Sequence, residues 1–407
     1  MKSLNLTLMK NLVFNCLLLL TALPIWGHTR VDNNPKYEKT KTYQRNFDVA
    51  PNALLLLDNR YGSIEVVESK TAKVSIDVVV RVWGNQMSSI EDKLDEIFVD
   101  ITGSKTRVSA VTSIGNTQWN WSFWKNNSIS YEINYVVHAP ATMIMEVSQK
   151  YGDITVARST NALKIVCAYG NIELGQISGE ATRIEIDYAN NSHIEKISQA
   201  QIDADYSNLV IGSSSYLNLH TDYSDISLKQ VKKVDLDMDY GQLNIDSATA
   251  VHGSTDYVDV HLGTIGQFNL DMDYGDLSVK QLISSGASSK LTTSYTDVAI
   301  DQLNSSLALE MQYGQLDIDH WAGPTGQLDI EAQYTDISMS YDPLFSFSTA
   351  LSGSYITPKG LANLESTKRI EKSNSFTFEG YFKQLVEKKQ LFINARYGSI
   401  QLNNSSL

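Results

Sequence analysis

The chain has 407 residues, of which 42% are hydrophobic and 19% charged, and its formal net charge is −13. Residues 151–340 hold 27 acidic and 9 basic residues, a net charge of −18, so the rest of the chain carries +5. Because phosphate binding requires basic surfaces, this distribution excludes nucleic acid as an expected partner of that region.

Residues 1–27 predict a signal peptide. Lys2 and Lys10 accompany an apolar run over 12–20, and the small residue Gly27 stands at a suitable cleavage point. The run is too short for a membrane anchor, and no later segment approaches about 20 apolar residues. We therefore expect an exported protein without a transmembrane segment, placed in the periplasm, at the cell surface or outside the cell.

Residues 28–150 predict a β-rich cap that carries one short helix. Alternating apolar residues over 74–82 and 129–137 predict two long strands. Apolar residues at helical spacing behind a capping-box-like start at Ser89 predict a helix near 89–98. Such a cap would cover the first edge of the repeat that follows, since an open strand edge pairs with other chains.

An aromatic strip lies within this cap. Trp119, Trp121 and Phe123 alternate with polar residues, which places all three on one face of a strand. The strip could stack against the sugar rings of a glycan ligand, or it could pack on the cap's own core. The alternation alone leaves both interpretations open.

The centre of the chain repeats one phrase. Leu236-Asp-Met-Asp-Tyr-Gly-Gln-Leu-Asn-Ile245 returns almost unchanged as Leu270-Asp-Met-Asp-Tyr-Gly-Asp-Leu-Ser-Val279, and a copy already stands around Tyr61. Within 151–340 the repeat tyrosine recurs eleven times, every 17 to 21 residues. These tyrosines are Tyr151, Tyr169, Tyr188, Tyr206, Tyr223, Tyr240, Tyr257, Tyr274, Tyr295, Tyr313 and Tyr334.

Each repeat predicts one coil of a β-solenoid. Apolar residues tend to stand four and two before the tyrosine and three and five after it, which indicates two short strands joined by a bend. Another apolar residue often stands eight after the tyrosine and gives a third inward side. We therefore predict an all-β, single-chain solenoid (β-helix) of about 11 coils, with the tyrosines stacked inside because they share parity with the apolar residues before them. Cys167, the one cysteine of the mature chain, should be a small buried filler.

Residues 341–407 predict a loop followed by a closing coil. The stretch 348–374 is polar and irregular, which favours a long loop, whereas Phe376 to Phe378 and the run 391–402 have strand character. The run repeats the phrase around Tyr61, so its own tyrosine, Tyr397, should form the closing coil.

An aspartate directly precedes the tyrosine in six successive repeats, which predicts an outward ladder of carboxylates. Two interpretations remain open: a solvated acidic face that keeps the rod soluble, or a row in which Ca²⁺ bridges neighbouring coils through carboxylate oxygens. Ca²⁺ is the one cofactor that the sequence suggests. The ladder consists of Asp187, Asp205, Asp222, Asp239, Asp256 and Asp273, and the last five are the candidate metal ligands.

The signal peptide, the strand pair with a short helix and the Tyr-Gly-Asp-Ile-like coils ending in Tyr397-Gly-Ser-Ile-Gln-Leu402 resemble the bacterial adhesin-type β-solenoid family of Bacteroidetes and Firmicutes. The resemblance covers essentially the whole mature chain. It implies a β-helix of the cell envelope or a secreted one, without demonstrated enzymatic activity, and it supplies no catalytic residues.

Three classes of function can be compared from the sequence. The chain lacks the Gly-x-Ser-x-Gly, His-Glu-x-x-His, Walker and Cys-x-x-Cys motifs, and its carboxylates recur regularly instead of marking one place, so we expect no enzyme. We favour an adhesion or ligand-binding module that holds a glycan or an envelope protein. The alternative is a structural or sensory envelope protein in which the rod is a spacer, followed by a polysaccharide-active β-helix enzyme.

Overall fold

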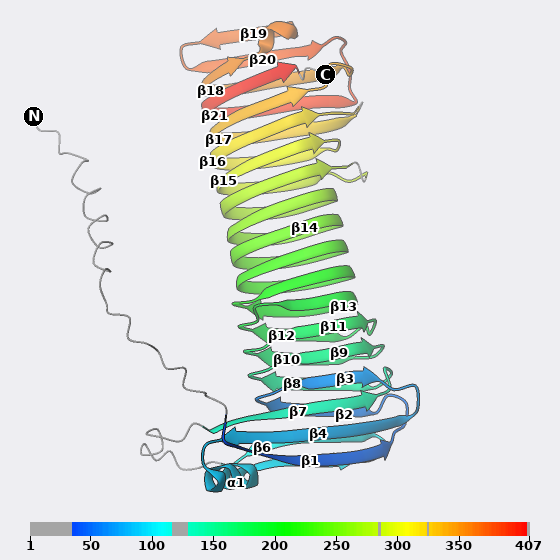
Figure 1. The fold of residues 1–407 in the computed structure, drawn as a ribbon. Helices are drawn as coiled ribbons and strands as arrows, with labels where there is room; N and C mark the ends of the chain where they lie inside the picture. Colours follow the sequence, from blue (N-terminus) through cyan, green and yellow to red (C-terminus); the bar gives the residue numbers. More distant parts are fainter. Residues whose placement is uncertain (1–34, 116–128, 284–285, 324, 405–407) are drawn as a thin grey trace, which may run out of the picture.

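The computed structural model describes residues 35–115, 129–283, 286–323 and 325–404, which form one sheet wound into a long rod (Figure 1). Within these residues α1 (Met87–Glu96) is the one α-helix, and nearly all other elements are strands. No helix in this part of the chain is long and apolar enough to cross a membrane. The predicted all-β class with one short helix is confirmed, and the largely parallel sheet is consistent with a β-solenoid.

The regular part of the rod is built from parallel strands that stack coil on coil. Its strands are β8 (Ile144–Lys150), β9 (Ile154–Ser159), β10 (Leu163–Ala168), β11 (Ile172–Ile177), β12 (Thr182–Asp187), β13 (Ser192–Asp205), β14 (Asn208–Leu282), β15 (Ser289–Leu303), β16 (Leu307–Trp321) and β17 (Gly326–Tyr341). In the first coils two short strands flank a bend, so that β8 pairs with β10 while β9 pairs with β11. Further along the strands merge, and β14 winds continuously past four repeat tyrosines (Figure 1).

The interior of the coils is apolar at the predicted positions. In the coil of Tyr313 the four flanking apolar residues are at most 2% exposed, namely Leu309, Met311, Leu316 and Ile318. The residue eight after the tyrosine is also buried in the predicted units, at Ile177, Val231, Ile265, Leu282 and Trp321. Cys167 is a free, buried cysteine, as expected for a filler. Each fully buried aliphatic side chain contributes roughly 1.5–3 kcal/mol, so packing holds these coils together.

At the N-terminal end, seven strands precede the regular part of the rod, and the second and third of them form its first coil. They are β1 (Tyr37–Asp48), β2 (Leu54–Arg60), β3 (Ile64–Glu68), β4 (Lys73–Gly84), β5 (Ile97–Gly103), β6 (Arg107–Ile114) and β7 (Ile129–Ala139). β2 and β3 stack on β8 and β9, and β6 and β7 cover their other edge. β4 lies antiparallel between β7 and β1. The two long strands predicted over 74–82 and 129–137 are confirmed as β4 and β7.

The helix lies close to its predicted place but begins differently. α1 starts two residues before the predicted residue 89 and ends at Glu96, because Ile97 already belongs to β5. The expected capping box is wrong: the N-cap residue is Gln86, without a side-chain cap hydrogen bond. Ile90 packs inside, as its helical spacing indicated. The predicted signal peptide, residues 1–27, lies outside the described residues.

At the C-terminal end, the loop expected over 348–374 is wrong. This region contains β18 (Phe347–Lys359), the 3₁₀ turn η2 (Leu361–Asn363) and β19 (Glu365–Lys372), followed by β20 (Ser375–Phe382) and β21 (Lys389–Asn404). β18 lies antiparallel to β20 and parallel to β21, and its Leu351 is 1% exposed. A strand rich in serine, glycine and threonine therefore forms here because it has two pairing partners, which its composition does not reveal.

The closing coil is also different from the predicted one. β21 pairs in parallel with both β17 and β18 and so lies between them, which Figure 1 shows near the top of the rod. After β17 the chain does not stack the next strand, β18, directly on it. The gap of one strand between them is occupied later by β21. Tyr397 therefore occupies the last level but one, and the last coil around the column is that of Tyr355.

Candidate functional site

The most distinctive surface of the rod is a column of fourteen stacked tyrosine rings among the described residues. Successive ring centroids lie 4.7–5.0 Å apart, and neighbouring planes differ by at most 21°. Every ring belongs to a residue that is 38–55% exposed. In spatial order the tyrosine column runs through Tyr61, Tyr151, Tyr169, Tyr188, Tyr206, Tyr223, Tyr240, Tyr257, Tyr274, Tyr295, Tyr313, Tyr334, Tyr397 and Tyr355.

The prediction that these tyrosines point inward is wrong, although the predicted stacking is confirmed. The parity argument assumed an extended backbone through the tyrosine. Instead every tyrosine of the column has φ between 50° and 62°, in the left-handed region, so the chain bends at the tyrosine itself. Asp239 and Tyr240 are consequently both exposed, while Met238 and Leu243 on either side remain inside. The rings stack on the surface of the rod.

The residue after the tyrosine is often glycine because the next coil lies very close. Gly241 has φ +143°, and a Cβ atom on it would lie 2.0 Å from the carbonyl oxygen of Ser224 in the preceding coil. At Gly152 the corresponding distance, to the carbonyl oxygen of Gly62, is 1.6 Å. The small residues of the repeat phrase therefore allow the bends to stack at strand spacing.

A tyrosine is an unusual choice at this bend. The left-handed conformation costs a non-glycine residue roughly 1–2 kcal/mol, and asparagine or glycine would adopt it more easily. The same residue nevertheless stands at this point in all fourteen described coils of the column. Backbone strain repeated in this way indicates that the ring itself contributes something, either through stacking or through binding.

The aspartates before the tyrosines form the predicted outward ladder. β-sheet register places Asp187 beside Asp205 and Asp205 beside Asp222, and the side chains of all six aspartates are exposed. None of the six forms an ion pair with another described residue, whereas Asp203 and Asp235, in neighbouring columns, pair with Arg183 and Lys233. The ladder is therefore a row of carboxylates without local counter-charges.

The carboxylates of the ladder repel one another, which contributes to the raised pKa values of two of them. The pKa of Asp239 is raised by partial desolvation and by the charges of Asp256, Asp222 and Asp237. The pKa of Asp205 is raised by desolvation and by neighbouring carboxylates, against a lowering hydrogen bond from the backbone of Asp222. Repulsion between neighbouring carboxylates is therefore a second cause of both shifts, after desolvation.

A second row of polar residues, two positions after the tyrosine, has a structural role. The Asp153 Oδ1 atom accepts a hydrogen bond of 2.8 Å from the backbone N–H of Asn171 in the next coil. Asp297 and Asp336 accept equivalent bonds from Gln315 and Ser399. At these three positions the carboxylate therefore ties one bend to the next.

Basic residues occupy the ladder position near the ends of the column. Arg60 stands beside Lys150 in the register, and Arg396 stands beside Gln333. The Lys150 ammonium lies 5.1 Å from the ring centroid of Tyr151 and 5.8 Å from that of Tyr169. Sequence reasoning missed this contact, although a lysine at the aspartate position of the repeat was a visible signal.

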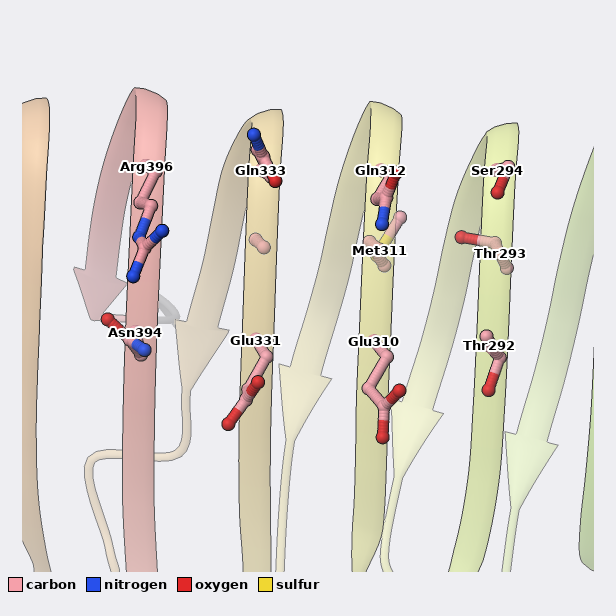
Figure 2. A pocket seen from close by; sticks show the side chains of 11 residues that line it. Thr292, Thr293, Ser294, Glu310, Met311, Gln312, Glu331, Gln333, Asn394 and Arg396 are labelled. Atoms are coloured by element: carbon pink, nitrogen blue, oxygen red, sulfur yellow. The ribbon is translucent and has the colours of Figure 1, made fainter.

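A shallow hollow of about 300 Å³ lies on the same side of the rod in its C-terminal third. Figure 2 shows its two rows of outward side chains: Ser294, Gln312, Gln333 and Arg396 continue the ladder position, and Thr292, Glu310, Glu331 and Asn394 form the row beside it. The hollow is mixed in charge, since Glu310, Glu331 and Arg396 all line it.

The remaining predicted site residues are not brought together. Among the described residues no group of three or more His, Cys, Asp or Glu side chains could hold a metal ion. The candidate Ca²⁺ ligands lie one per coil in a single row, at Asp205, Asp222, Asp239, Asp256 and Asp273. Ca²⁺ bridging between neighbouring members of this row stays a prediction. The aromatic strip of Trp119, Trp121 and Phe123 lies outside the part of the chain that the structure describes.

Comparison with known proteins identifies the repeat. Residues 185–375 match the family model described as Toastrack DUF4097, which confirms the resemblance predicted from the sequence. No curated protein matches the chain.

Solved structures that match the chain include two candidate adhesins, from Parabacteroides merdae and Parabacteroides distasonis. The first is 8% identical with a TM-score of 0.32 and covers 71% of this chain and 95% of its own. The second is 10% identical with a TM-score of 0.23 and covers 87% and 97%. A candidate cell adhesion protein from Clostridium sporogenes is 8% identical with a TM-score of 0.17 and covers 91% and 100%. Similarity at this level does not assign a function.

Proposed function

We propose that this toastrack-type rod is a non-enzymatic adhesion or ligand-binding module of the cell envelope and that the tyrosine column is its binding face. The protein would be exported and act in the periplasm, at the cell surface or after secretion, on a glycan or an envelope protein. The observation that carries the proposal is the column itself: fourteen half-exposed rings in one line, each on a backbone conformation that disfavours tyrosine.

The column suits a long ligand better than a small one. At a strand spacing of about 4.8 Å, its fourteen rings extend over roughly 60 Å. Contiguous exposed aromatic surface of this extent is typical of interaction sites. A linear ligand lying along the rod would repeat the same weak contact at many coils, and linked weak contacts add up to strong binding.

The alternative is a structural spacer, in which the rings serve only to stiffen the rod. It is favoured by the stacking, since each ring already contacts one on either side, as Tyr240 contacts Tyr223 and Tyr257. Both functions use the same residues, so the two must be separated by experiment.

The test compares binding and stability in one triple variant. Tyr223→Asn, Tyr240→Asn and Tyr257→Asn remove three central rings, while asparagine tolerates the left-handed backbone. The wild type and this variant would be applied to an array of purified glycans and envelope proteins, and their unfolding would be followed in urea. We expect the variant to remain folded and to lose the ligand that the wild type retains. A folded variant with unchanged binding would contradict the proposed face, and a wild type that retains no ligand would favour the spacer.

A further inference from the structure

We propose that the partner of the central tyrosine column, between Tyr188 and Tyr274, is a basic polypeptide segment whose lysine or arginine side chains lie along the rings. This inference rests on the proposed function and adds the chemical class of the ligand. It follows from three observations: what part of the rings is free, which charge lies beside them, and how the chain's own lysine contacts the column.

The free part of the rings is their outer edge. Both faces of a central ring are covered by its neighbours, since centroids lie 4.7–4.9 Å apart on either side of Tyr240 with interplanar angles of 1° and 4°. A sugar ring that stacks on an aromatic face finds little such face here. Long aliphatic side chains with a charged end can instead lie against ring edges and place the charge beyond them.

The charge beside the central rings is negative and unbalanced. Six successive coils place an exposed aspartate directly before the tyrosine, and none of these six carboxylates forms an ion pair within the described residues. Two carboxylates outside the ladder, Asp203 and Asp235, are by contrast paired with Arg183 and Lys233. A cationic partner would therefore meet an unbroken row of six unpaired carboxylates along the central tyrosine column.

The N-terminal end of the column provides an internal example of this contact. There the position before the tyrosine is lysine, and the Lys150 ammonium lies near the centroids of both Tyr151 and Tyr169, at 5.1 and 5.8 Å. Both distances are within the roughly 6 Å over which an ammonium group and an aromatic ring interact, so a lysine can lie against this column. In the six central coils the same position is aspartate, so a cation beside those rings would have to come from another molecule.

The experiment uses the full mature chain and a fluorescent ten-residue oligolysine as the probe. Fluorescence polarisation would measure its affinity for the wild type, for a column variant and for a charge-matched control. The column variant combines Asp222→Asn, Asp239→Asn and Asp256→Asn. The control combines Asp100→Asn, Asp301→Asn and Asp319→Asn, three exposed aspartates outside the ladder, and changes the net charge equally.

We expect the column variant to bind oligolysine about tenfold more weakly than the wild type, whereas the control should change the affinity little. Binding should weaken with added salt, and oligoglutamate should not bind. A second variant, with Tyr223→Phe, Tyr240→Phe and Tyr257→Phe, should keep the affinity, because the rings remain and only the hydroxyl groups are lost. Equal losses in the column variant and the control would overturn the inference, since oligolysine would then respond to net charge alone.

The outcome can be separated from that of the proposed function. Suppose that the triple Tyr→Asn variant loses a glycan ligand that the column variant, with its three Asp→Asn changes, still binds. The tyrosine column is then a binding face, but its partner is not a basic polypeptide. If neither variant affects any ligand or oligolysine, both proposals fail together.

Discussion

The inner and outer sides of each coil follow different rules. Inside, the residue two before the tyrosine varies in size and type, from Cys167 and Ala204 to Met238 and Met311, all of them buried. Outside, the bend carries tyrosine in every described coil of the column. Interior positions need only an apolar side chain of suitable volume, because neighbouring coils adjust to one another. The outer position needs a particular backbone angle and a particular ring.

The two sides should therefore respond very differently to the same substitution. Leu243→Asp places an unpaired charge in the interior, where Leu243 is 0% exposed, and should destabilise the rod by several kcal/mol. That loss is comparable with the whole stability of many domains, so the central coils should unfold. Tyr240→Asp, at a residue 41% exposed, should leave them folded. Circular dichroism during urea unfolding would compare them, and equal destabilisation would show that the two sides do not differ.

This comparison also explains which features the sequence predicted. The inward positions around Tyr313 follow from alternation, because each half coil is regular strand. Alternation does not predict whether the tyrosine points inward or outward. Several residues lie between the last inward position before the tyrosine and the first one after it, and the bend can lie at any of them. Tyr240 and Gly241 both have positive φ, so the bend includes the tyrosine itself. A tyrosine that never varies, beside core positions that do, was the available signal.

The order of coils at the C-terminal end was beyond the reach of sequence analysis for a different reason. The phrase around Tyr397 correctly indicates a coil, but any coil can stack on any other with the same register. In its position between β17 and β18, β21 pairs with the open edges of both strands. Tyr355 was overlooked because Ser, Gly, Thr and Pro surround it, and such a composition favours a loop.

Lys389 is a charged residue in an interior that is otherwise mostly apolar. It is fully buried, donates hydrogen bonds to the carbonyl oxygens of Gly323 (2.7 Å) and Trp321 (3.4 Å), and lies 4.3 Å from the Trp321 ring centroid. Burial lowers its pKa to about 8, against the opposing effect of Asp342. Between about pH 8 and 10.5 the folded state thus binds fewer protons than the unfolded state, and stability rises with pH by on the order of 3 kcal/mol.

The Lys389→Met variant should lack this rise. Urea unfolding of the wild type and the variant would be compared across the same pH range, because all other groups are common to the two proteins. The difference between the two curves isolates the lysine. Parallel curves would mean that the Lys389 ammonium is not buried and that the C-terminal interior follows the same rule as the rest.

The bend can be tested apart from the ring through Gly241→Ala. The added Cβ atom would lie 2.0 Å from the Ser224 carbonyl oxygen at a φ of +143°, so we expect a loss of about 2–3 kcal/mol. Gly286→Ala is the matched control, because Gly286 also has a positive φ (+84°) but a Cβ atom added to it would meet nothing within 4 Å. The control should lose about 1 kcal/mol or less. Equal losses would mean that backbone strain alone, and not the close approach of coils, requires glycine there.

The smallest effect, and the most informative for function, should come from Tyr240→Asn. The variant loses ring contacts with Tyr223 and Tyr257, each worth about 0.5–1.5 kcal/mol, but asparagine recovers part of the roughly 1–2 kcal/mol of left-handed strain. We expect a net loss of about 1 kcal/mol or less in urea unfolding. Tyr240→Val, which loses the ring without easing the backbone, should cost about 1–2 kcal/mol more. If the asparagine variant instead loses as much as the valine variant, stacking dominates and the spacer is favoured. A nearly neutral asparagine variant would mean that stability does not require the ring, which leaves binding as the reason for a tyrosine on every coil.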